Sequence, residues 1–194
     1  EAIDAVTTGT IALPTNGNNF TVTDTSISAG TLISLNNQYS GIVDASAVKA
    51  ITGIASEITT AYSSSGITSL GDESITVTSA VTKVKVDTIN GYTTGQVTLT
   101  SVADTFANIT AIDALTTSEV TMGAANITVT DQITSSQAEI VKGFTTGEIV
   151  VNILPDINDG QASFSINGTA AVGNTLSINE NSADPDGTGT LSYS

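Results

Sequence analysis

The chain contains no cysteine, no histidine, no tryptophan and no arginine among its 194 residues. Without cysteine, a disulfide framework and thiolate metal sites are excluded. Without histidine, the usual general base and the commonest zinc ligand are missing. No nucleophile motif of the Gly-x-Ser-x-Gly kind occurs, so we expect no enzyme. No apolar run approaches the roughly 20 residues that a membrane-spanning helix needs, so we expect no membrane insertion.

Basic residues are also scarce. Four lysines stand against 19 acidic residues, which gives a formal net charge of −15. Nucleic-acid binding requires clustered cations to neutralise phosphates, so we expect no nucleic-acid partner. A strongly negative protein stays soluble and attracts divalent cations.

One sequence pattern occurs three times. Each copy begins with a run that alternates apolar and hydroxylated residues. A glycine follows later in the copy, and a second apolar run begins one or two residues after that glycine. The first apolar residues of the two runs are separated by a constant number of positions. The paired apolar positions are Phe20 and Ile42, Ile75 and Val97, and Ile127 and Ile149, and their offset is the same in each copy (42−20, 97−75 and 149−127). Equal spacing in three copies indicates a structural repeat.

Each alternating run predicts a β-strand, and the residues after it predict a brief helix. Gly41, Gly95 and Gly147 follow these helices, where we expect a glycine to supply a left-handed conformation.

Two connecting segments predict longer helices, because their apolar residues form stripes. The positions are Val48, Ile51, Ile54 or Ala55, Ile58 and Tyr62 in one, and Val102, Phe106, Ile109, Ile112 and Leu115 in the other. Ser101, with Asp104 three positions later, resembles a cap for the second helix.

Strands separated by helices run parallel, with right-handed crossovers. The sequence therefore predicts an α/β fold, a repeat solenoid of parallel strands and short helices over residues 1–153, with units near 20–74, 75–126 and 127–153. An all-β parallel helix is the alternative, because Thr, Val and Ile favour strands. Residues 3–13 match residues 89–99, so the chain enters in mid-repeat and we expect it to be a piece of a longer protein.

The pattern changes after Asn152. Residues 154–160 are rich in turn residues and predict a linker. Residues 161–194 hold short alternating runs around Asn167-Gly168, which is typical of the N-terminal strands of a β-sandwich, Ig-like module. This segment is too short to close a sandwich, so we expect completion by later sequence or by another chain.

Two segments resemble known families. Residues 41–71 (GIVDASAVKAITGIASEITTAYSSSGITSLG) resemble the repeat region of large bacterial, cyanobacterial-type extracellular surface or adhesin-like proteins. Residues 166–177 and 184–193 resemble the first strands of an Ig-like or cadherin-like adhesin repeat. The resemblance implies an extracellular or cell-surface location and a structural or adhesive role.

Calcium is the expected cofactor, because two loops are rich in the oxygen ligands that it prefers. Residues 156–160 also resemble the Asp-x-Asn-Asp-Asn linker of cadherins and depart from it at the final glycine. The alternative is that these residues only make turns. The candidate ligands are Asp156, Asn158, Asp159, Asp184 and Asp186.

Threonine runs are the second candidate site. The two threonines of a Thr-x-Thr run share one face of a strand, so stacked strands would align their hydroxyls in columns. The candidates are Thr21, Thr23, Thr76, Thr78, Thr128 and Thr130, and Thr98 with Thr100 forms a further run of this kind. Such an array could bind ice or a crystalline polysaccharide, although threonine is common on any solvated strand.

Two functions follow as expectations. The first is an extracellular structural or adhesive repeat protein, a spacer or filament-forming segment of a larger surface protein, with copies of itself or surface polysaccharide as partners. The second is a carbohydrate- or ice-binding module that uses the threonine faces.

Overall fold

The computed structural model describes residues 19–38, 40–115, 117–155 and 163–182. The chain divides into two compact parts, Glu1–Leu154 and Pro155–Ser194, which we call the body and the C-terminal part.

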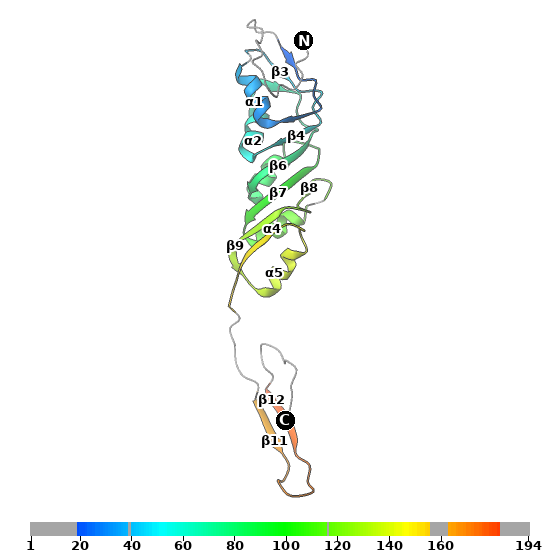
Figure 1. Ribbon diagram of the computed structural model, residues 1–194, viewed down its shortest axis with the longest axis vertical. Helices are drawn as coiled ribbons and strands as arrows, with labels where there is room; N and C mark the ends of the chain where they lie inside the picture. Colours follow the sequence, from blue (N-terminus) through cyan, green and yellow to red (C-terminus); the bar gives the residue numbers. More distant parts are fainter. Residues whose placement is uncertain (1–18, 39, 116, 156–162, 183–194) are drawn as a thin grey trace. The chain divides into compact units, whose positions relative to one another are not determined.

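Five strand–helix units, each a β-strand followed directly by an α-helix, make up most of the described body (Figure 1). They are β2 Ser26–Ser28 with α1 Ala29–Gln38, β4 Ala50–Gly53 with α2 Ala55–Ser63, β6 Ser74–Val81 with α3 Lys83–Asn90, β7 Val97–Asp104 with α4 Phe106–Asp113, and β9 Asn126–Ile133 with α5 Ser135–Lys142. A last strand, β10 Ile149–Ile153, follows the fifth unit.

These six strands form one parallel path in the order β10-β9-β7-β6-β4-β2, so each strand lies beside that of the next unit. One row of direct partners runs through Ile27, Ile51, Ile75 and Val97, at nearly constant offsets along the chain (51−27, 75−51, 97−75). The predicted α/β class with parallel strands is confirmed. The five helices in the described residues show that the all-β alternative is wrong.

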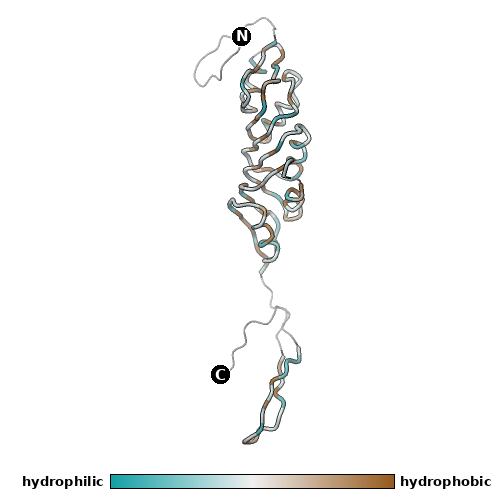
Figure 2. The backbone as a smooth tube through the Cα atoms, turned by 90° about the vertical axis from the view of Figure 1, so that its right-hand side faces the viewer, coloured by the Kyte–Doolittle hydropathy of each residue, from teal (hydrophilic) through white to brown (hydrophobic). Residues whose placement is uncertain are grey.

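The core lies between the sheet and the helices. In β6 the side chains of Ile75 and Val77 are fully buried and Thr76 between them is partly exposed, as an alternating strand requires. From the other side α3 buries Val86 and Ile89, which are three positions apart on one helix face. Apolar segments recur along the backbone of the body (Figure 2), as this repeated burial requires.

The two long helices expected from apolar stripes are shorter in the structure. Ile51 lies in β4 and α2 begins only at Ala55, while Val102 lies in β7 and α4 begins at Phe106. Each stripe therefore combines a strand with a helix of eight or nine residues. The prediction failed because a buried strand residue followed by a helix face produces the same apolar spacing.

Smaller strands complete the body. β1 Phe20–Thr21, β3 Val43–Asp44 and β5 Ile67–Thr68 pair in parallel as a separate sheet. β8 Val120–Thr121 pairs with the first residues of β7, and β9 pairs with the later residues of β7.

The C-terminal part contains an antiparallel pair, β11 Ser163–Asn167 and β12 Ser177–Ser182. Gly168, directly after β11, has φ +125°, so the predicted Asn-Gly turn uses a conformation that favours glycine. The apolar pair Ala171-Val172 in the sequence also predicts a short strand, but in the structure Ala171 lies in a bend and Val172 in a turn, so this prediction is wrong.

Candidate functional site

Threonines from neighbouring strands form one column on the outer side of the sheet. The register pairs Thr76 with Thr52 and with Thr98, and pairs Thr98 with Thr121. Each follows a buried residue of the inner row, so its side chain points away from the core. Thr52 is exposed and the other three are partly exposed. Neighbouring parallel strands are about 4.8 Å apart, which sets the spacing of the column.

The predicted threonines do not all lie in this column. Thr128 pairs with Ala103 and Val150. Thr21 lies in the separate sheet beside Asp44. Thr23 lies outside the described strands, and neither Thr78 nor Thr130 has a Cα partner in the described register, although both are exposed. Thr52 and Thr121 were missed because they lie outside the Thr-Val-Thr runs, and only the strand register shows that they are partners of Thr76 and Thr98.

A second feature, which we call the Thr-Thr-Gly bridge, joins the loop before one strand to the loop before its neighbour. Thr93 Oγ1 donates a hydrogen bond to the carbonyl of Glu73 (2.6 Å) and accepts one from the Gly95 N–H (2.9 Å). The N–H of Thr94 donates to the carbonyl of Gly71 (2.8 Å). Two successive units are thereby tied through their backbones.

The same bridge recurs between the loops before β9 and β10. Thr145 Oγ1 donates to the carbonyl of Ala125 (2.6 Å), and the Gly147 N–H donates to Thr145 Oγ1 (2.9 Å). The N–H and the hydroxyl of Thr146 both donate to the carbonyl of Gly123, at 3.0 Å. Recurrence with matching distances shows that the motif has a fixed structural role.

The glycines of these bridges serve close approach. Positive φ among the described glycines occurs at Gly71, Gly168 and Gly173, so the left-handed conformation expected at Gly41, Gly95 and Gly147 is wrong. A Cβ at Gly95 would stand 2.3 Å from the carbonyl oxygen of Glu73, and one at Gly147 would stand 2.3 Å from that of Ala125. Only glycine allows the backbones to lie so close.

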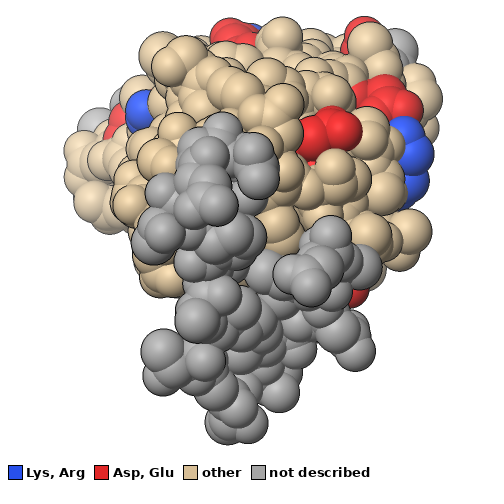
Figure 3. Space-filling model, turned by 90° about the horizontal axis from the view of Figure 1, so that it is seen from above, with Lys and Arg blue, Asp and Glu red and all other residues tan. Residues whose placement is uncertain are grey.

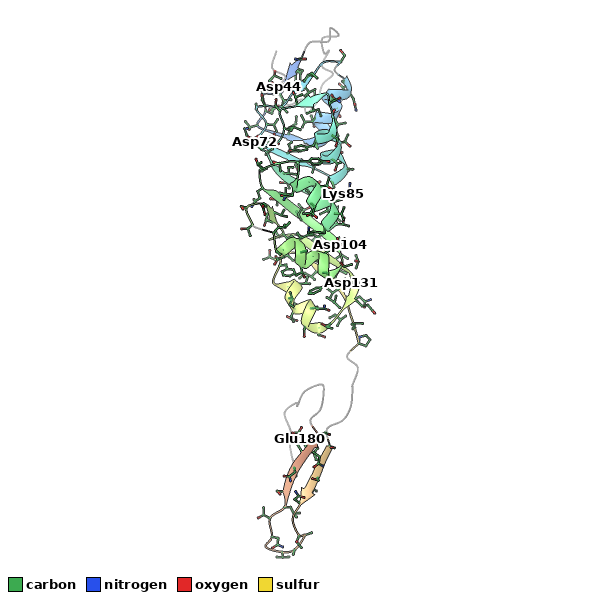
Figure 4. All side chains as sticks on the ribbon, turned by 180° about the vertical axis from the view of Figure 1, so that it is seen from behind. Asp44, Asp72, Lys85, Asp104, Asp131 and Glu180 are labelled. Carbon is green, nitrogen blue, oxygen red and sulfur yellow. The ribbon has the colours of Figure 1, made fainter. Side chains whose placement is uncertain are left out.

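The helices are also capped from the neighbouring unit. The first N–H of a helix has no partner within the helix and needs an acceptor. The pairs are Ala55 N–H to Ser79 Oγ (3.1 Å), Lys83 N–H to Asp104 Oδ2 (2.8 Å) and Phe106 N–H to Asp131 Oδ1 (2.8 Å). Asp104 and Asp131 lie at different levels of the body (Figure 4). Each cap comes from the unit that follows in the chain, so local sequence rules could not find it.

Asp104 therefore has a different role from the one expected. The N-cap of α4 is Thr105, whose side chain accepts from the N–H of Asn108, while Asp104 caps α3. Partial burial acts to raise the pKa of Asp104, but hydrogen bonds from the Asn108 side chain and from the Lys83 and Thr105 N–H groups outweigh it and hold that pKa below its ordinary value.

A buried carboxylate lies at one of these junctions. The side chain of Glu73 is fully buried, and its Oε2 accepts hydrogen bonds from the Tyr62 hydroxyl (2.7 Å) and from the Gly71 N–H (2.8 Å). Within the described part of the chain its Oε1 has no partner. Burial and the hydrogen bond to the carboxylate both raise the pKa of Tyr62. The rings of Tyr62 and Tyr92 stack with centroids 5.1 Å apart.

The predicted calcium ligands Asp156, Asn158, Asp159, Asp184 and Asp186 lie outside the described residues. Among the residues that are described, no group of three or more acidic side chains is placed to hold a metal ion. None of the helices in the described ranges combines the length and apolar character needed to cross a bilayer.

Comparisons with family models, with curated proteins and with solved structures give no match to this chain. The candidate site is therefore described from the contacts between this chain's own residues. Those residues supply contacts between successive units, together with one outward column of hydroxyl groups.

Proposed function

We propose that the body is an α/β solenoid that serves as a spacer or filament-forming segment of an extracellular surface protein. The observation that carries the proposal is the repeated interface between units. Strand pairing, the Thr-Thr-Gly bridge and the helix cap from the next unit all act between neighbours along the chain. Proteins built in this way gain length by adding units, because each unit contacts only its neighbours.

The C-terminal part is proposed to begin an Ig-like β-sandwich module. Its two antiparallel strands expose Ile166 and Ile178, which are direct partners in the register. An isolated two-stranded hairpin is marginally stable in water, so further strands must cover this face. Later sequence or another chain would supply them. An adhesive role, with calcium bound by the acidic residues of 156–159 and 184–186, fits a spacer that is followed in the sequence by such a module.

Duplication of one unit tests the solenoid. Residues 75–96 form one complete repeat, because Ile75 pairs with Val97. A second copy of these residues, inserted after Gln96, should fold, raise the helical circular dichroism and lengthen the body by about 4.8 Å in small-angle scattering. A matched control inserts residues 75–96 in scrambled order, which should not fold. Unfolding of the true duplication would contradict the solenoid.

The location has its own test. Antibodies raised against the body should label intact, unpermeabilised cells of the source organism. Labelling that requires permeabilisation would contradict an extracellular role.

The threonine column supports a second candidate, a surface that binds crystalline polysaccharide or ice. Its support is the register of Thr52, Thr76, Thr98 and Thr121 on one side of the sheet. A double change of Thr76→Val and Thr98→Val should abolish co-sedimentation with insoluble polysaccharide or adsorption to ice. The matched control is Thr60→Val with Thr88→Val, two exposed helix positions. Equal effects of the two double variants would argue against this surface.

A further inference from the structure

The last strand of the body leaves apolar side chains exposed, and at one position the neighbouring strand buries the direct partner. In β9, Ile133 is 1% exposed, while its direct partner Ile153 in β10 is 45% exposed. Val150 and Leu154 are 52% and 41% exposed. The difference arises because β9 is covered by a following strand and, among the described residues, β10 is not.

The backbone of β10 has a free edge within the described part of the body. The N–H of Ile127 donates to the carbonyl of Glu148, so the backbone carbonyl of Glu148 points toward β9. In a parallel ladder these groups alternate between the two edges, so the N–H groups of Ile149 and Val151 face the other side. β10 contains no charged residue and no proline, which are the usual protections of an edge strand.

The first unit of the described body presents the opposite end. Among the described residues β2 pairs with β4 alone. Neither β2 nor α1 contains a charged residue, and Ile27, Ile33 and Leu35 are only partly buried. Where no grey atoms cover it, the end of the body near α1, seen from above in Figure 3, shows mostly uncharged side chains and a few charged ones.

We propose that the β10 edge of one copy binds the β2–α1 unit of a second copy, so that the sheet continues head to tail between chains. Inside the chain, the edge that is exposed at β10 is covered in each earlier unit by another strand–helix unit of this same protein, and a second copy would continue that pattern. The elements that would meet, β10 on one copy and β2 with α1 on the other, contain no charged residue, which allows contact between chains whose net charge is −15. The inference rests on the proposed solenoid and names its partner.

The β10 end of the body carries its own helix cap. Helices α2, α3 and α4 take their first cap from the next unit, whereas α5 has a capping box made by its own Thr134 and Gln137. In the register of Ile133 with Ile153, the position equivalent to the capping residues is Pro155, which offers no side-chain acceptor. The fifth unit is therefore complete without a following helix, while its sheet edge stays open to a strand. Head-to-tail contacts of this kind build open filaments.

Light scattering coupled to size exclusion tests the proposal with the full chain. The wild type should show a mass that rises above that of one chain with concentration, and rises further with salt, because salt screens the repulsion between copies. The double variant Val150→Lys with Ile153→Lys should stay single. The control Val84→Lys changes a side chain that is 72% exposed on α3, away from both ends, and should associate like the wild type.

Mixing two blocked chains tests the direction of assembly. The variant Ile33→Lys blocks the α1 end and should also stay single, with its circular dichroism checked for folding. An equimolar mixture with the β10 double variant should give particles of two chains and nothing larger. The Ile33→Lys variant keeps an intact β10 edge and the β10 double variant keeps an intact α1 end, so each chain can make one contact. If the contact instead joined two β10 edges, the Ile33→Lys variant would dimerise without a partner variant. Particles that form only in the mixture exclude that arrangement.

A wild-type chain that stays single at every concentration and salt would overturn the inference. In that case slow hydrogen exchange at residues 149–153 would assign the edge to another part of the same chain. The proposed spacer would remain intact provided that the duplication of residues 75–96 still lengthens the body, so the two failures are distinguishable.

Discussion

Replacement of Gly95 by alanine should destabilise the body sharply, because it forces two units apart. The new Cβ would stand 2.3 Å from the carbonyl oxygen of Glu73 and 2.6 Å from its carbon. Ordinary contact begins near 3.4 Å, so the backbones must separate by about 1 Å (3.4−2.3). That separation weakens the hydrogen bond from Thr93 Oγ1 to the same carbonyl and the one from the Ile75 N–H to the Gln96 carbonyl (2.8 Å).

The magnitude follows from these two effects. Overpacking against well-packed atoms costs about 1–3 kcal/mol, and each weakened hydrogen bond costs about 1 kcal/mol. A loss of roughly 3 kcal/mol in the free energy of unfolding is expected. For a chain of this size that corresponds to a fall of about 6–12 °C in melting temperature.

Urea unfolding followed by circular dichroism would measure the change, with Gly91→Ala as the matched control. Gly91 ends α3 with φ −72°, and a Cβ there would meet its nearest atom at 3.4 Å. Alanine at a compatible site stabilises by about 0.4–1 kcal/mol through the unfolded chain. The two alanine variants should therefore shift the midpoint in opposite directions. Equal midpoints would refute close approach as the reason for glycine in the Thr-Thr-Gly bridge.

Three further predictions concern charge and metal. Hydrogen bonds hold the pKa of Asp104 below its ordinary value of 3.8. The Asp104 carboxylate therefore stabilises the fold fully above pH 3.8, and this stabilisation is lost as the pH falls through the lowered pKa. The melting temperature should fall less steeply in acid for Asp104→Asn than for the wild type. Tyr62→Phe removes a donor to the buried Glu73 carboxylate and should lower the free energy of unfolding by about 1.5–3 kcal/mol, whereas Tyr92→Phe, which keeps the ring stack, should lower it less; a reversed order in urea unfolding would contradict the assigned bond. If the predicted ligands Asp156 and Asp184 bind calcium, EDTA should lower the melting temperature of the full chain, and an unchanged midpoint would remove the calcium hypothesis.

The sequence by itself determined the class of the fold and its local elements. Alternation of Ile, Thr and Val at residues 75–78 and 127–130 predicted β6 and β9. Two of the three pairs at constant offset, Ile75 with Val97 and Ile127 with Ile149, are direct partners in the sheet, whereas Phe20 of the first pair lies in the separate sheet and pairs with Val43. These features are visible in one dimension because a strand alternates its side chains and a repeat preserves its length.

The tertiary structure alone decided what holds the units together. The predicted units 20–74 and 75–126 each hold two strand–helix units and 127–153 holds one, as the spacing of the glycines indicated, but the spacing does not say which atoms join one unit to the next. The need for glycine at position 95 and the helix cap by Asp104 both depend on atoms that belong to the neighbouring unit. Propensity and local capping rules describe neighbours in sequence, and these contacts exist only once one unit lies against the next.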